Sequence, residues 1–183
     1  MTPMKSKELP LKLDEAIAWV TLDPRTRQFI AVKVHQKHLR FSCQRCAIFC
    51  CRLGGPSLDH SDIARIAERG HSLKDFLDQS IRSGNRGSKA LSTVLKSKPD
   101  GSCIFLRPSF EGTCPACAIY DSRPSLCKLY PFHLELITPT SLRLEIIPCC
   151  YGLNTPTGEL VDEDFIIQYL REPIIDALRG GSL

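Results

Sequence analysis

The hydrophobic pattern of the chain begins with two strand-like segments on either side of a short polar turn. Residues 16–22 (AIAWVTL) and 27–34 (RQFIAVKV) are rich in aliphatic and aromatic residues. Between them, residues 23–26 (DPRT) place proline at a position that a type I turn accepts. This pattern predicts a β-hairpin that leads the chain to its first cysteines.

Further strands are predicted in the second half of the chain. Residues 132–138 (FHLELIT) and 142–147 (LRLEII) predict a second hairpin, which turns at residues 139–141. Residues 90–98 and 103–107 are predicted to pair as strands around the sequence Pro-Asp-Gly that separates them.

Two amphipathic helices are predicted between the hairpins. Residues 62–70 (DIARIAERG) repeat apolar residues at helical spacing and end on a glycine. Ser72 and Asp75 form a capping-box pattern at the start of residues 72–84 (SLKDFLDQSIRSG). A helix is also predicted from Glu159 onward, where Pro173 starts a new segment or kinks it.

These elements predict an α+β fold, a small single domain of short β-hairpins and short helices around a cysteine-rich metal centre. Long helices do not alternate with strands, so a doubly wound sheet is not expected. Residues 82–89 (RSGNRGSK) are expected to be a solvated loop, since no GK[ST] element follows. We expect an N-terminal β-hairpin region (1–40), a cysteine-cluster metal-binding domain (41–152) and a C-terminal helical tail (153–183).

Composition and charge narrow the class of protein. Of the 183 residues, 43% are hydrophobic, which is enough to build one core. The N-terminal residues lack the apolar stretch of a signal peptide, and no segment is long enough to span a membrane. We therefore expect a cytoplasmic protein with reduced thiols. We do not expect nucleic-acid binding from the formal charge of +4, because metal-bound cysteines are thiolates and cancel it. The cations interpreted as counter-charge are Arg45, Arg52, Arg123 and Lys128.

The chain contains 10 cysteines, of which four lie in the run FSCQRCAIFCCRLGG at residues 41–55. Thiolates two and three residues apart can converge on one metal centre. Adjacent cysteines on a strand point to opposite faces, so two metal sites fit the two Cys-Cys pairs more easily than one. A cysteine can also pack as a small hydrophobic residue, and we expect two of the set to do so.

Several features follow one another along the chain. They are the motif FxCxxCxxxCC, an amphipathic helix, CIFL (103–106), CAIYDSRPSLCKLYPF (117–132) and a late cysteine after a strand. This order resembles the YkgJ-type cysteine-cluster family, small proteins described as zinc- or iron-chelating. The resemblance runs from about Phe41 to Gly152. It implies eight metal ligands, namely Cys43, Cys46, Cys50, Cys51, Cys103, Cys117, Cys127 and Cys149.

The chain departs from the family pattern at several positions. Three residues rather than two separate Cys46 from Cys50, and lysine stands at position 128 where arginine is usual. Cys114 and Cys150 are additional cysteines. The choice between Cys149 and Cys150 as the ligand therefore stays open.

The ligand spacing favours an iron–sulfur cluster with a redox or catalytic role, because clusters tolerate irregular spacing. The alternative is a zinc-stabilised binding module without catalytic activity. Arg123, between two ligand cysteines, is predicted to contact the cofactor sulfurs, with a structural salt bridge as the alternative. His133 is interpreted as a surface or packing residue.

The sequence does not assign catalytic residues. Family relatives include a lysine methylase that acts on flagellin, so the enzyme classes considered are an iron–sulfur oxidoreductase and a methylase-related, protein-modifying activity. No glycine-rich segment for S-adenosylmethionine is visible. A protein partner or an electron donor is the kind of partner expected.

Overall fold

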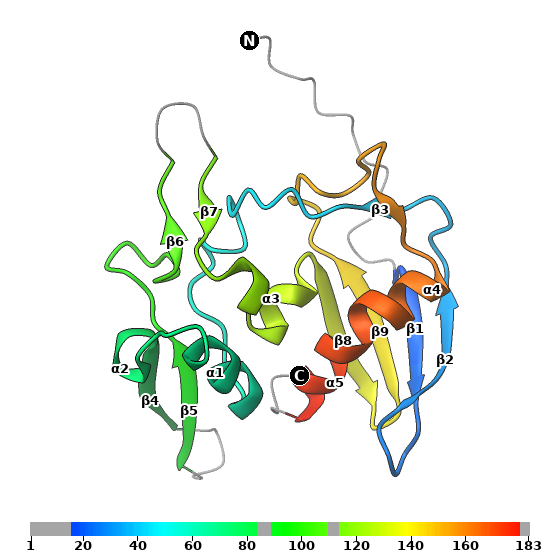
Figure 1. The fold of residues 1–183 in the computed structure, drawn as a ribbon. Coiled ribbons are helices and arrows are strands. Elements are labelled where there is room, and N and C mark those ends of the chain that lie inside the picture. The colour runs from blue at the N-terminus through cyan, green and yellow to red at the C-terminus, as the bar shows by residue number, and fades with distance from the viewer. Residues whose placement is uncertain (1–15, 84–88, 110–113, 180–183) are drawn as a thin grey trace.

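The computed structural model describes residues 16–83, 89–109 and 114–179 (Figure 1). Short antiparallel strands form several small sheets, and short helices pack beside them. The predicted α+β class is confirmed. The described residues form two lobes, each around its own hydrophobic core, which we call the sheet lobe and the small lobe.

The sheet lobe is built on a four-stranded antiparallel sheet with the order β2-β1-β9-β8. Both predicted hairpins are confirmed and supply all four strands. Leu22, Leu142 and Leu144 are fully buried on the covered face of this sheet, beneath Ile166 and Leu170 of the C-terminal helices. The bounds are β1 Ala18–Leu22, β2 Phe29–Val34, β8 Phe132–Thr138, β9 Ser141–Ile146, α4 Glu163–Phe165 and α5 Arg171–Arg179.

The C-terminal helical segment is present but begins later than predicted. Residues Glu159–Leu160 form β10, which pairs with β3 (Arg40–Phe41), and the helix starts only after Asp162 caps it. A π-helical stretch, Ile166–Leu170, lies between α4 and α5. Pro173 has no backbone N–H to donate to the preceding turn, which accounts for the irregular helical hydrogen bonding just before it.

The small lobe contains the other helices and hairpins. Helix α1 is confirmed, and Asp59 caps it through a capping box with Asp62. Ile66 and Phe76 fill its core and are 0% exposed. Its bounds are α1 His60–Ala67, α2 Leu73–Phe76, β4 Leu77–Ser83, β5 Lys89–Leu95, β6 Leu106–Arg107 and β7 Ala116–Cys117.

Two predictions for this lobe are wrong. The helix predicted for residues 72–84 ends at Phe76, and the chain continues as β4. Strand β4 pairs with β5 from Leu77 opposite Leu95 onward, so tertiary pairing overrides the helical pattern. Residues 90–98 therefore do not pair with residues 103–107, except through one bridge between Ser97 and Cys103. Most of the predicted solvated loop lies outside the described residues.

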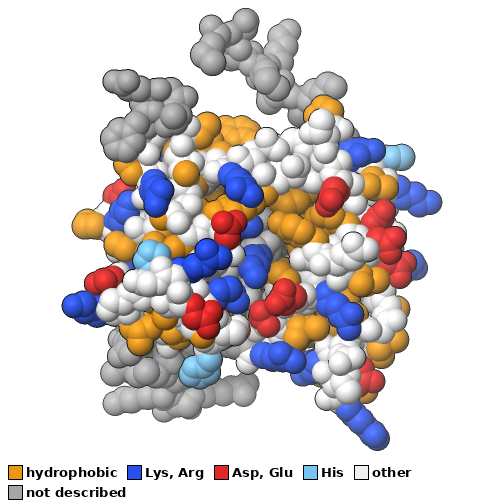
Figure 2. Space-filling model, in the orientation of Figure 1, with side chains coloured by type: hydrophobic (Ala, Val, Ile, Leu, Met, Phe, Trp, Pro, Cys, Tyr) orange, Lys and Arg blue, Asp and Glu red, His pale blue; other side chains and the backbone are white. Residues whose placement is uncertain are grey.

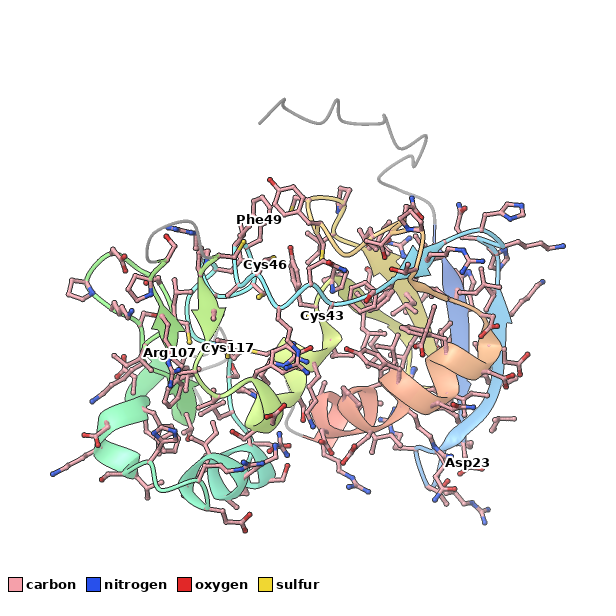
Figure 3. The ribbon with its side chains drawn as sticks, turned by 45° about the horizontal axis from the view of Figure 1, so that its top comes forward. Asp23, Cys43, Cys46, Phe49, Arg107 and Cys117 are labelled. Atoms are coloured by element: carbon pink, nitrogen blue, oxygen red, sulfur yellow. The ribbon has the colours of Figure 1, made fainter. Side chains whose placement is uncertain are left out.

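Helix α3 (Ser125–Leu129) connects the lobes and packs against α5. Figure 2 shows Lys and Arg side chains gathered along the middle of the face that carries the helices. The cysteines approach one another where the lobes meet, on the side of the molecule that Figure 3 brings forward.

Candidate metal centre

One cavity at the junction of the lobes is lined by cysteine side chains from five separate segments. It encloses about 50 Å³ and is otherwise bordered mainly by aromatic and aliphatic side chains. In Figure 3, Cys43 and Cys46 approach it from one segment and Cys117 from another. The lining cysteines are Cys43, Cys46, Cys50, Cys51, Cys103, Cys117, Cys127 and Cys150.

The first cysteine segment is folded by left-handed backbone and a tight turn. Arg45 and Ala47 have φ of 52° and 48°, a region that few residues other than glycine occupy. The N–H of Arg52 donates to the carbonyl of Phe49 at 2.8 Å and closes a turn around Cys50. This folded path keeps both Cys50 and Cys51 at the cavity, which an extended strand would not allow.

Backbone pairing brings the middle cysteines to Cys51. The N–H of Cys103 donates to the carbonyl of Cys51 at 2.7 Å. Cys117 lies opposite Leu106 in the short β6–β7 pair. The thiol of Cys51 consequently has the thiols of Cys103, Cys117 and Cys50 as hydrogen-bonding neighbours, and these contacts raise its pKa. The same contact with Cys51 lowers the pKa of Cys50 and of Cys117 to about 7.

Three of the lining cysteines share one local arrangement. The sulfur of Cys103 accepts the N–H of Phe105, and that of Cys117 accepts the N–H of Ile119. The N–H of Gly152 likewise donates to Cys150 Sγ at 3.4 Å. A hydrogen bond from the N–H two residues ahead favours the thiolate, which is the form that binds metals. These backbone segments are thus shaped to hold sulfur anions.

The structure places Cys150, and not the predicted ligand Cys149, at the cavity. Cys149 is exposed and its Sγ lies 3.7 Å from the Tyr130 hydroxyl. Cys150 is directed inward because Gly152 packs against the first cysteine segment, where the N–H of Ser42 donates to its carbonyl at 2.9 Å. A Cβ at position 152 would lie 2.5 Å from the carbonyl oxygen of Ser42. Only glycine allows this close approach.

Cys127 is positioned by a buried polar contact between the lobes. It lies on α3, whose first residue, Ser125, donates its N–H to the carboxylate of Asp62 at 2.9 Å. Asp62 is 2% exposed and also pairs with Arg65. Burial raises the pKa of Cys127, and the charges of the Cys103, Cys117 and Cys50 thiols raise it further. Neither Asp62 nor Ser125 was expected to serve the site, because their contact joins segments far apart in the sequence.

Arg123 lies beside Cys43 and not in a salt bridge. Its Nη1 is 3.9 Å from Cys43 Sγ, and its Nε donates to the carbonyl of Tyr120 at 3.0 Å. The guanidinium carbon lies 3.8 Å from the centre of the Tyr120 ring, and that of Arg45 lies 4.1 Å from it. Neither arginine pairs with a carboxylate among the described residues. Tyr120 therefore holds two cations at the edge of a thiol-rich cavity.

The remaining candidates lie away from the cavity lining. Cys114 is exposed. His133 lies on β8, 58% exposed, with its Nδ1 3.6 Å from a carboxylate oxygen of Glu145. This agrees with the interpretation of His133 as a surface residue.

The donor set fits a metal that prefers sulfur. Cysteine thiolates select zinc, copper(I) and iron–sulfur clusters over hard cations. Among the described residues, no three His, Cys, Asp or Glu side chains lie close enough together to hold a metal ion as they stand. The thiols line the wall of the cavity, so a metal would be bound by inward movement of these side chains.

Comparison with protein families supports this assignment. The family model CxxCxxCC, described as "Putative zinc- or iron-chelating domain", matches residues 42–150. The chain belongs to this family. The match includes every cysteine that lines the cavity, and it ends at Cys150. Membership of this CxxCxxCC family therefore supports metal binding by the cysteines that line the cavity.

A relative is known among the archaea. The uncharacterized protein MJ0661 of Methanocaldococcus jannaschii is 29% identical over 149 residues, which cover 77% of this chain and 76% of the relative. No solved structure matches the chain. Among the described residues of this CxxCxxCC protein, the helices are too short and too polar to cross a membrane.

Proposed function

We propose that this CxxCxxCC protein carries an iron–sulfur cluster in the cysteine cavity and uses it in a redox or catalytic role. The observation that carries the proposal is the gathering of eight thiols from five segments around one cavity. The cluster would supply electron transfer or a site for bond cleavage at iron. The chain supplies the thiolates, the surrounding cations and the enclosure.

The spacing of the lining thiols supports a cluster over a lone zinc ion. Structural zinc sites usually combine two C-x2-C pairs, and only Cys43 and Cys46 form such a pair within the lining set. The cavity volume of about 50 Å³ exceeds the ~10–15 Å³ that one water-sized atom needs. Both features suit a cofactor of several atoms.

Backbone donors also support an anionic cofactor. Within the described parts of the chain, the N–H groups from Cys43 to Phe49 donate no hydrogen bond to another residue. Ala47, in this stretch, is only 4% exposed. Buried N–H groups normally have an acceptor, and backbone nests of this kind bind the sulfurs of iron–sulfur sites.

Arg123, Tyr120 and Arg45 would complete the cofactor environment. The guanidinium of Arg123 can donate to Cys43 or to a cofactor sulfur beside it. The two cations on Tyr120 would offset the negative charge that thiolates bring to a cluster.

A zinc-stabilised binding module is the second candidate. The family description names zinc beside iron. Two large apolar side chains, Leu53 and the cavity-lining Tyr151, are 72% and 62% exposed and could meet a protein partner. Zinc would then hold the two lobes together without any reaction.

Anaerobic purification with metal and acid-labile sulfide analysis separates these candidates. A brown protein that contains iron and sulfide in equal amounts supports the cluster. A colourless protein with stoichiometric zinc supports the binding module. A protein without metal, even after anaerobic reconstitution with iron and sulfide or with zinc, contradicts both.

A further inference from the structure

The eight lining thiols fall into two groups according to the lobe that surrounds them. Cys43 and Cys150 pack against the core of the sheet lobe. Cys51 and Cys103 belong to the core of the small lobe, and Cys50 and Cys117 pack against it. A single centre would draw ligands from both cores to one point.

Contacts between thiols follow the same division. The thiols whose charges raise the pKa of Cys150 are those of Cys43, Cys46 and Cys50. The hydrogen-bonding neighbours of Cys51 are Cys103, Cys117 and Cys50, and the charges of these same three thiols raise the pKa of Cys127. Cys50 borders both groups.

We propose that the chain holds two separate metal centres, each with four thiolate ligands. The outer centre consists of Cys43, Cys46, Cys50 and Cys150, and the inner centre of Cys51, Cys103, Cys117 and Cys127. The boundary runs between the adjacent residues Cys50 and Cys51. Placing Cys50 in the outer centre completes four ligands on each side, which is the number that zinc and iron–sulfur clusters take.

The two centres differ in their surroundings. The inner centre contains the two most buried thiols, since Cys51 and Cys103 are 7% and 5% exposed. The outer centre lies beside Arg123, and its four cysteines are half-buried. The inner centre ties α3 to the small lobe, whereas the outer centre is the one that a soluble reagent or partner can approach.

The inference rests on the proposed metal binding but not on the identity of the metal. Zinc alone is therefore a suitable probe, because a four-thiolate site binds Zn²⁺ whichever metal it holds in the cell. The full chain is prepared metal-free under anaerobic, reducing conditions, titrated with Zn²⁺ and weighed by native mass spectrometry.

We expect two zinc ions per wild-type chain, and one in each of the variants Cys46→Ser and Cys103→Ser. Cys114→Ser, the matched control, should retain two. One zinc in the wild type, or loss of all zinc from Cys46→Ser, would overturn the two-centre assignment while leaving metal binding intact. A wild-type chain that binds no zinc and no iron would instead remove the proposed function itself.

Cobalt(II) provides a second measurement if Cys103→Ser does not fold. The thiolate-to-cobalt absorption of Cys46→Ser should saturate at half the amplitude of the wild type. Full amplitude, or none, would contradict the proposal, because Cys46 contributes only to the outer centre.

Discussion

The carboxylate of Asp62 on α1 accepts the N–H of Ser125 on α3 at 2.9 Å, and the Ser125 hydroxyl lies 3.2 Å from the same oxygen and 2.8 Å from the carboxylate of Asp176. Ser125 precedes the cavity residue Cys127 by two positions, so this buried contact fixes one wall of the metal centre. The contact joins segments that lie far apart in the sequence, and Asp62 is only 2% exposed.

Replacing Asp62 should therefore destabilise the fold. Asp62→Ala leaves the Ser125 N–H without its acceptor and the Arg65 guanidinium without its carboxylate, and we expect a loss of about 3 kcal/mol in the free energy of unfolding. Asp62→Asn retains an acceptor oxygen and should lose clearly less. Denaturant unfolding measures both. Asp121→Ala, at an exposed position of the short 3-10 helix Tyr120–Ser122, is the control, and an equal loss from it would refute the assigned role.

Arg123 should strengthen metal binding without being a ligand. Arg123→Gln removes the cation beside Cys43, and outer partners of this kind change metal affinity by about 10- to 100-fold. We expect zinc affinity, measured by competition with a chelator, to fall by about tenfold with the stoichiometry unchanged. Arg179→Gln removes the same charge at the exposed end of α5. If both variants lose affinity equally, the effect is one of net charge and not of position.

Gly152 should be essential for placing Cys150. In Gly152→Ala the new Cβ would lie 2.5 Å from the carbonyl oxygen of Ser42, so the Cys150 segment must move outward. We expect a loss of roughly 1–3 kcal/mol in stability and of one zinc ion per chain.

Gly70→Ala is the matched control for this prediction. Gly70 has φ of +88° but open space around it, so alanine is strained there without a collision. This variant should lose stability and keep its full zinc content. Retention of full zinc content by Gly152→Ala would show that Cys150 is not held by this packing.

Metal affinity should fall as the pH falls. Burial raises the pKa of Cys150 to about 11 and also raises that of Cys127, so both are protonated near neutral pH in the metal-free chain. Their folded pKa values lie above the ordinary value, and each metal ion must displace these protons. We expect zinc affinity to weaken by at least about tenfold for each pH unit between pH 8 and 6. An affinity that is constant over this range would exclude thiol ligands.

The elements that sequence could predict are those with strong local signals. Both hairpins follow from alternating residues and turn residues, and α1 follows from helical periodicity and Gly70. The prediction of a second helix is wrong because apolar and polar residues around Leu77 fit the alternation of a strand as well as the spacing of a helix. Their strand partner, β5, comes later in the sequence, and its pairing with β4 decides the conformation.

The site could be predicted as a set of cysteines but not as a geometry. Spacing alone treats Cys149 and Cys150 as equivalent, whereas the close packing of Gly152 turns only Cys150 inward. Tyr120 and Arg45 lie in recognised motifs, yet their stacking depends on how two separate segments fold together. Such contacts leave no periodic signal in a single sequence.

X-ray absorption at the metal edge of protein purified anaerobically would test the central claim most directly. The account predicts iron whose nearest neighbours are sulfur atoms alone, at about 2.3 Å, with a second iron in the next shell. Zinc surrounded by four sulfurs would retain the thiolate site and contradict the cluster. Nitrogen or oxygen ligands around the metal, or no bound metal, would contradict the assignment of the cysteine cavity as a metal centre.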